Sequence, residues 1–91
     1  MADTRSYTGV TEGVFDCAKA ALQQNRFSIP AGTSGTIVAQ PAGAIVTLEF
    51  LWDDVADTLD LEVTNKPSFI PVDQVWALTD AGITGCGGSV V

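Results

Sequence analysis

The stretch Thr58-Leu59-Asp60-Leu61-Glu62-Val63-Thr64-Asn65 (residues 58–65) alternates between polar and apolar residues from Thr58 to Thr64. Side chains in a β-strand point to opposite faces with a period of two, so the three apolar residues share one face. Lys66-Pro67 ends the pattern, because proline cannot donate a hydrogen bond to a neighbouring strand. The stretch therefore predicts a strand with one buried face and one polar face.

Two further strands are expected on its N-terminal side. Residues 44–52 also alternate, and residues 36–40 are rich in β-formers, with Pro41-Ala42-Gly43 as the turn between them. The alternation places two sets of side chains on opposite faces of the 44–52 strand: Ala44, Val46, Leu48, Phe50 and Trp52 on the inner face, and Ile45, Thr47, Glu49 and Leu51 on the outer face. Short connections make consecutive strands neighbours, which predicts an antiparallel sheet.

One amphipathic helix is expected before these strands in the sequence and another after them. Apolar residues recur at helical spacing from Gly9 to Asn25, with Thr8 as the expected N-cap. A second helical pattern runs from Pro71 to Ile83, and proline is favoured at a first helical position.

The predicted fold is a two-layer α+β sandwich in the order helix–three-stranded antiparallel sheet–helix, with both helices on one face of the sheet. Residues 8–83 form the single domain. Residues 1–7 are expected to be a flexible leader, and residues 84–91 a flexible glycine-rich tail.

The last third of the chain carries a resemblance. The run from Leu59 to Pro67, followed by the run from Phe69 to Val75, resembles small uncharacterised bacterial α-β-β-β-α proteins, in which a last strand leads through Lys-Pro into a proline-opened helix. The resemblance implies the helix–sheet–helix fold only, and it implies no function and no site residues.

Composition limits the partners. The chain has 91 residues, 46% of them hydrophobic, a mean hydropathy of +0.27 and a net charge of −7 from 11 acidic and four basic residues. So few cations disfavour binding to nucleic acid or to an anionic membrane. A basic protein partner fits better, and the high apolar content in a small domain favours a homodimer.

Location and cysteine chemistry follow from simple features of the chain. The polar start and the lack of a long apolar run predict a soluble cytoplasmic protein. Cys17 and Cys86 lie far apart in the sequence, and reduced thiols are expected, with a disulfide between them as the less favoured alternative.

The outer face of the sheet is the main candidate site. Residues that face each other on paired strands must share a face, and this rule leaves two registers, with Glu49 opposite either Glu62 or Asp60. Both registers set like charges side by side. The predicted partner-binding residues are Ile45, Glu49, Leu51, Asp60 and Glu62, and a plain solvated surface is the alternative.

Two other functions remain open. A small apolar ligand could bind between helices and sheet, in a pocket lined by Phe15, Leu22, Phe50, Trp52 and Trp76. A hydrolase could use Glu49 with Asp60 or Glu62 as a carboxylate pair, although an exposed sheet does little to tune a carboxylate. The chain has no histidine, and the sequence indicates no cofactor, no metal site and no catalytic residue. A non-enzymatic protein is therefore expected.

Overall fold

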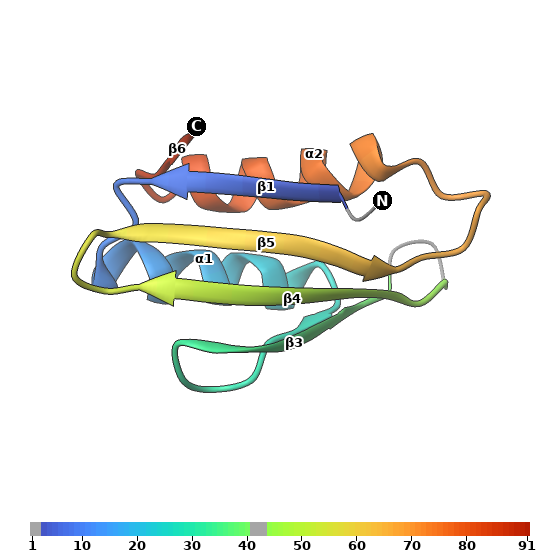
Figure 1. Ribbon diagram of the computed structural model, residues 1–91, viewed down its shortest axis with the longest axis horizontal. Coiled ribbons are helices and arrows are strands. Elements are labelled where there is room, and N and C mark those ends of the chain that lie inside the picture. The colour runs from blue at the N-terminus through green and yellow to red at the C-terminus, as the bar shows by residue number, and fades with distance from the viewer. Residues whose placement is uncertain (1–2, 41–43) are drawn as a thin grey trace.

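The computed structural model describes residues 3–40 and 44–91, which form two helices and one antiparallel sheet of six strands (Figure 1). The elements in chain order are β1 (Asp3–Thr8), α1 (Glu12–Gln24), β2 (Phe27–Ser28), β3 (Ser34–Ala39), β4 (Val46–Asp53), β5 (Thr58–Asn65), α2 (Val72–Thr84) and β6 (Ser89–Val90). Across the sheet the strands lie in the order β2-β3-β4-β5-β1-β6. The first and last strands of the chain are therefore neighbours at one edge.

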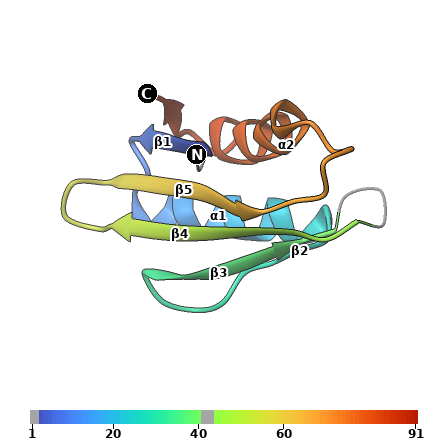
Figure 2. The same cartoon turned by 45° about the vertical axis from the view of Figure 1, so that its right-hand side comes forward.

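Both helices pack on the same face of the sheet, and the other face is left uncovered (Figures 1 and 2). The core lies between the two layers. From the strands it takes Tyr7, Ile37, Ala39, Val46, Leu48, Phe50, Leu59, Leu61 and Val63, and from the helices Phe15, Ala18, Leu22, Val75, Trp76 and Ile83. Burying one such large apolar side chain contributes roughly 1.5–3 kcal/mol, which is why alternation along the strands decides which face is covered.

The predicted three-stranded sheet is wrong, although a two-layer α+β arrangement is consistent with the structure. The prediction for residues 58–65 is confirmed as β5, but β5 is a central strand with β4 on one side and β1 on the other. The three additional strands are β1, β2 and β6. Two of them come from the ends of the chain, which the sequence assigned to a leader and a tail.

The start of α1 also differs from the prediction. Thr11, not Thr8, is the N-cap, and its side chain accepts a hydrogen bond from the Val14 backbone N–H. Thr8 belongs to β1, and Gly9 follows it with a φ of +66°, a left-handed conformation that glycine adopts readily. The chain therefore turns at Gly9 before the helix can begin. The turn predicted at Pro41-Ala42-Gly43 lies outside the described residues, as do Met1 and Ala2 of the predicted leader.

A partly buried polar cluster ties β1 to α2. The Tyr7 hydroxyl donates to Asp80 Oδ1 at 2.7 Å and lies 2.8 Å from Thr79 Oγ1, while Arg5 Nη2 donates to Asp80 Oδ2 at 2.8 Å. Arg5 and Tyr7 both point to the helix side of the sheet, because their register partners are Leu61 and Leu59. The cluster explains how a strand with a charged inner residue packs against the core: the charge finds its partner on the helix above it.

Tyr7 gives this cluster a pH signature. Burial of its hydroxyl is the largest cause and raises the pKa of Tyr7 above its ordinary value of 10.0. The hydrogen bond with Thr79 lowers the pKa, the hydrogen bond and the charge of Asp80 raise it, and the charge of Arg5 lowers it slightly. A group whose pKa is higher in the folded state than in the unfolded state contributes its full stability below the unfolded-state pKa. That stability is lost as pH rises from the unfolded-state pKa to the folded-state pKa.

We expect the free energy of unfolding to fall above pH 10 by about 1.4 kcal/mol per pH unit from this group alone. Tyr7 is the single tyrosine of the chain, so phenolate absorbance reports it without interference. In an alkaline titration the phenolate signal should appear only together with unfolding. Tyr7→Phe should lack this part of the pH dependence while being less stable at neutral pH by about 1–3 kcal/mol, because Asp80 loses a buried donor. A phenolate signal near pH 10 in the folded protein would contradict the prediction.

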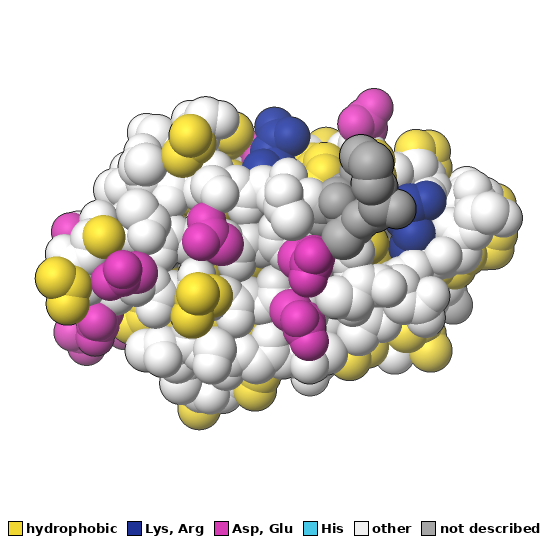
Figure 3. Space-filling view, in the orientation of Figure 1, with side chains coloured by type: hydrophobic (Ala, Val, Ile, Leu, Met, Phe, Trp, Pro, Cys, Tyr) yellow, Lys and Arg dark blue, Asp and Glu magenta, His cyan; other side chains and the backbone are white. Residues whose placement is uncertain are grey.

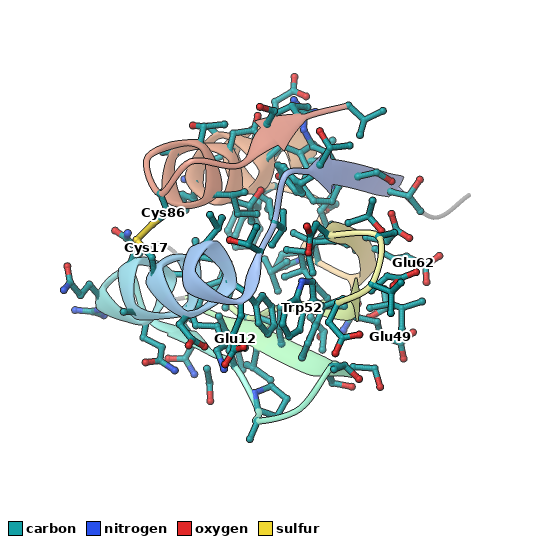
Figure 4. The ribbon with its side chains drawn as sticks, turned by 90° about the vertical axis from the view of Figure 1, so that its left-hand side faces the viewer. Glu12, Cys17, Glu49, Trp52, Glu62 and Cys86 are labelled. Atoms are coloured by element: carbon teal, nitrogen blue, oxygen red, sulfur yellow. A yellow bond between two sulfur atoms is a disulfide. The ribbon has the colours of Figure 1, made fainter. Side chains whose placement is uncertain are left out.

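Cys17 and Cys86 form a disulfide, so the expectation of reduced thiols is wrong. The bond joins the middle of α1 to the turn after α2, with the two Cα atoms 5.8 Å apart across 69 residues of sequence (Figure 4). This pairing could not be predicted from the spacing of the two cysteines, because they meet only when both helices pack side by side on the sheet. A cross-link over so long a loop restricts the unfolded chain strongly.

Reduction of this disulfide should lower the free energy of unfolding by about 4 kcal/mol, the loop-entropy estimate for a loop of this length. Urea denaturation with and without a thiol reductant measures the difference. The matched control is the double variant Cys17→Ser/Cys86→Ser, which should unfold at the same lower urea concentration whether or not reductant is present. A wild-type midpoint that does not move on reduction would show that the cross-link contributes nothing.

Candidate functional site

The candidate site is the uncovered face of the sheet, here called the open face. Of the two registers left open by the sequence, the structure has the one that places Glu49 of β4 directly opposite Glu62 of β5. Leu51 then faces Asp60 in the next row. Directly opposed side chains have Cβ atoms about 5 Å apart, so the carboxylates of Glu49 and Glu62 are close neighbours.

Neighbouring strands extend both rows with hydroxyl groups. Thr36 of β3 pairs with Glu49, and Thr4 of β1 pairs with Glu62. Ser34 and Ser6 flank the second row in the same way, and the Ser6 hydroxyl donates to Asp60 Oδ1 at 2.6 Å. The open face therefore has three carboxylates and one leucine at its centre, with short hydroxyl side chains on either side.

The carboxylates of this face lack ion-pair partners among the residues that the structure describes. The ion pairs found there are Arg5–Asp80 and Lys19–Asp16, and neither includes Glu49, Asp60 or Glu62. Figure 3 shows acidic side chains over the middle of the sheet, with the visible Lys and Arg side chains toward its margins. The face therefore presents uncompensated negative charge.

Leu51 adds an apolar side chain to the open face, and a second exposed apolar residue, Ile45, directly precedes β4. Leu51 is 57% exposed and Ile45 is 56% exposed, both well above what a core residue shows. Leu51 stands beside a shallow depression of about 430 Å³ that Glu49, Asp60, Glu62, Thr4 and Ser6 also line. Of the five residues predicted from the sequence, Glu49, Leu51, Asp60 and Glu62 surround this depression, and Ile45 lies outside it, just before β4.

Thr4, Ser6 and Thr36 were missed as members of this face. Thr4 and Ser6 lie on β1, which the sequence analysis treated as a flexible leader. The signal was present in the alternation of Thr4-Arg5-Ser6-Tyr7-Thr8, but a strand whose inner positions include an arginine does not match the apolar pattern that marks a buried face.

The predicted apolar pocket has little room. Phe15, Leu22 and Phe50 line a cavity of about 20 Å³ between the layers, which holds one water molecule at most and lies far below the 300–1,000 Å³ typical of ligand pockets. Trp52 instead stacks on Phe15 and donates its indole N–H to the Val10 carbonyl at 2.8 Å. Trp76 is buried beneath β1, with the Arg5 guanidinium 5.9 Å from its ring centroid. The five residues do not share one cavity, and this geometry gives the ligand-binding alternative no support.

The chemistry of the open face is that of accessible carboxylates. Glu49 and Asp60 are exposed and Glu62 is half-buried, so water reaches the pair that a hydrolase would need to desolvate. Within residues 3–40 and 44–91, no cluster of three or more Asp, Glu or Cys side chains is arranged so that it could hold a metal ion. The arrangement is suited to attracting a cation-bearing group rather than to acid–base chemistry.

Replacing Glu49 by lysine should make the protein more stable. Glu49→Lys turns a like-charge pair with Glu62 into an opposite-charge pair, for an expected gain of about 0.5–1 kcal/mol in the free energy of unfolding. Urea denaturation at low salt measures the gain, which should shrink at high salt because exposed charges are screened. A loss of stability at low salt would mean that the two carboxylates do not repel each other in the folded protein.

Comparison of the chain with family models, with curated proteins and with solved structures finds no match. The resemblance drawn from residues 59–75 therefore stays a prediction. Neither helix in the described part of the chain is long and apolar enough to cross a membrane.

Proposed function

We propose that the chain is a non-enzymatic protein-binding module whose open face contacts a partner bearing lysine or arginine side chains. The observation that carries the proposal is the direct opposition of Glu49 and Glu62, with Asp60 next to them and no ion pair to any of the three among the described residues. A cationic side chain placed over this group would relieve the repulsion between the carboxylates. Charge complementarity of this kind also steers the encounter of two proteins.

The apolar and hydroxyl residues suit the same partner. Leu51 offers a surface for the aliphatic stem of a lysine or arginine, or for an apolar neighbour on the partner. Thr4, Ser6 and Thr36 provide hydrogen-bonding groups around it. An interface with an apolar centre and a polar rim is the usual arrangement in protein complexes.

Self-association is the second candidate, favoured by the exposure of Ile45 and Leu51. A homodimer through this face would, however, bring together two copies of Glu49, Asp60 and Glu62. Six carboxylates in one interface would oppose association, so the charge argues for a basic partner over a second copy.

The disulfide bears on location. Disulfides persist in oxidising compartments and are rare in the cytosol, so the Cys17–Cys86 bond favours an oxidising environment over the cytoplasmic location expected from the sequence. The proposed partner would then be met outside the reducing cytosol.

A short oligolysine peptide serves as the probe. We expect it to shift the backbone amide signals of Glu49, Asp60 and Glu62 in NMR titrations, with binding that weakens as sodium chloride is added. Glu49→Gln should weaken binding by roughly fivefold to tenfold, because the central carboxylate is lost. Asp73→Asn is the matched control: it removes one negative charge from the exposed start of α2, outside the open face, and should change the affinity little.

Equal effects of the two substitutions would show that only net charge matters, and the open face would lose its role. Sedimentation equilibrium of the protein alone tests the second candidate function, self-association. A dimer that Leu51→Lys converts to a monomer would show that the face serves self-association instead.

A further inference from the structure

A second concave feature lies on the other side of the sheet from the open face. It is a groove of about 430 Å³ between the start of α1, the end of β4 and the loop before β3, here called the aromatic groove. Its lining residues are Glu12, Phe15, Asp16, Lys19, Gly32, Thr33, Trp52 and Asp54. Figure 4 shows Glu12 and Trp52 near each other on the helix side of the sheet, with Glu49 and Glu62 on the opposite side.

Two stacked aromatic rings form the wall of this groove. The ring centroids of Phe15 and Trp52 are 4.3 Å apart with an interplanar angle of 19°. The indole is held in place by its hydrogen bond to the Val10 carbonyl, and Phe15 is a residue of α1 that is buried in the hydrophobic core. The ring pair is therefore positioned by the fold itself, without help from a ligand.

The charge of the groove is negative, and one internal cation already occupies it. Three carboxylates, those of Glu12, Asp16 and Asp54, line the groove together with one ammonium, that of Lys19. Lys19 Nζ lies 4.9 Å from the centroid of the Phe15 ring and 3.8 Å from Asp16 Oδ1. The side chain of Lys19 is only 25% exposed, against 65% for Asp16, because its stem lies over Phe15 and the small apolar cavity.

We propose that the aromatic groove is a binding site for an organic ammonium group, and that Lys19 is its built-in occupant, which an external ammonium displaces. The two contacts that Lys19 makes, one to an aromatic face and one to a carboxylate, are the contacts by which proteins recognise alkylated ammonium ions. Glu12 and Asp54 supply the negative charge that remains after Lys19 and Asp16 have paired. The long flexible stem of lysine allows its ammonium to leave the groove without unfolding α1.

A neutral ligand fits these observations less well. A sugar could stack on Trp52 and donate hydroxyl groups to the carboxylates, but it would leave a net charge of two negative units uncompensated in the groove. The ammonium already placed over Phe15 shows directly which chemistry the wall accepts.

The test compares Lys19→Met with wild type, using tetramethylammonium chloride as the probe and sodium chloride at equal ionic strength as the reference. Methionine keeps an apolar stem over Phe15 and removes the competing ammonium. The indole N–H signal of Trp52 in NMR spectra reports binding. We expect Lys19→Met to bind the probe roughly fivefold more tightly than wild type, because the site no longer has to release its own occupant.

Matched controls separate the groove from global charge. Lys66→Met removes the same single positive charge outside the groove and should bind like wild type. In the Lys19→Met background, Glu12→Gln should weaken binding. The proposal is overturned if Lys19→Met and Lys66→Met behave alike, or if tert-butanol, a neutral probe of similar shape, shifts the Trp52 signal as strongly as tetramethylammonium.

A second experiment decides whether the ammonium group belongs to a protein or to a small free compound. A short peptide with one trimethyllysine that binds Lys19→Met much more tightly than tetramethylammonium assigns the site to a protein-borne cation, and equal affinities assign it to a small free ammonium compound. Either result supports the site. Probe-induced shifts at Glu49 and Glu62 with none at Trp52 overturn it, while leaving the proposal for the open face standing.

Discussion

One-sided burial of the sheet is the constraint on which the rest of the structure depends. Both helices cover the same face, so each strand must send alternate residues inward. Phe50 and Leu61 are paired across β4 and β5 on the inner face, and this pairing fixes Glu49 opposite Glu62 on the outer face. A slip by one residue would expose the core, and a slip by two would place Glu49 opposite Asp60, so neither change of register separates the carboxylates on the open face.

The central part of this arrangement was predictable, because it depends on local alternation. The bounds of the strand at residues 58–65 and the placing of Glu49 opposite an acidic residue of that strand both follow from a period of two, and the structure selects Glu62 over Asp60 as the partner. The strands that come from the two ends of the chain, β1 and β6, were not predictable in this way. Arg5 points inward only because Asp80, 75 residues away, neutralises it, and the Cys17–Cys86 bond depends on the packing of two helices. A local pattern carries no information about partners so distant in the chain.

The candidate sites, too, were predictable only where they depend on a local sequence pattern. The open face was predicted from β4 and β5, but its hydroxyl rim on β1 was missed along with that strand. The predicted apolar pocket failed to form because Phe15, Leu22 and Phe50 close against one another, as tightly packed cores do. Trp52 was predicted to line the same pocket, whereas it is half-buried and lines the aromatic groove at the margin of the core.

Strand β4 connects the two proposed sites, since Glu49 and Leu51 point to the open face and Trp52, one residue further on, points to the aromatic groove. The chain's own cations leave both sites with net negative charge, although Lys19 pairs with Asp16 in the aromatic groove. Of the four, Arg5 is held by Asp80 and Lys19 by Asp16, both on the helix side of the sheet. With 11 acidic residues and two of its four cations paired in this way, the folded protein presents negative charge on both sides of one strand. This uncompensated negative charge on both sides of β4 is the shared feature on which the two proposals rest, because it attracts cationic groups.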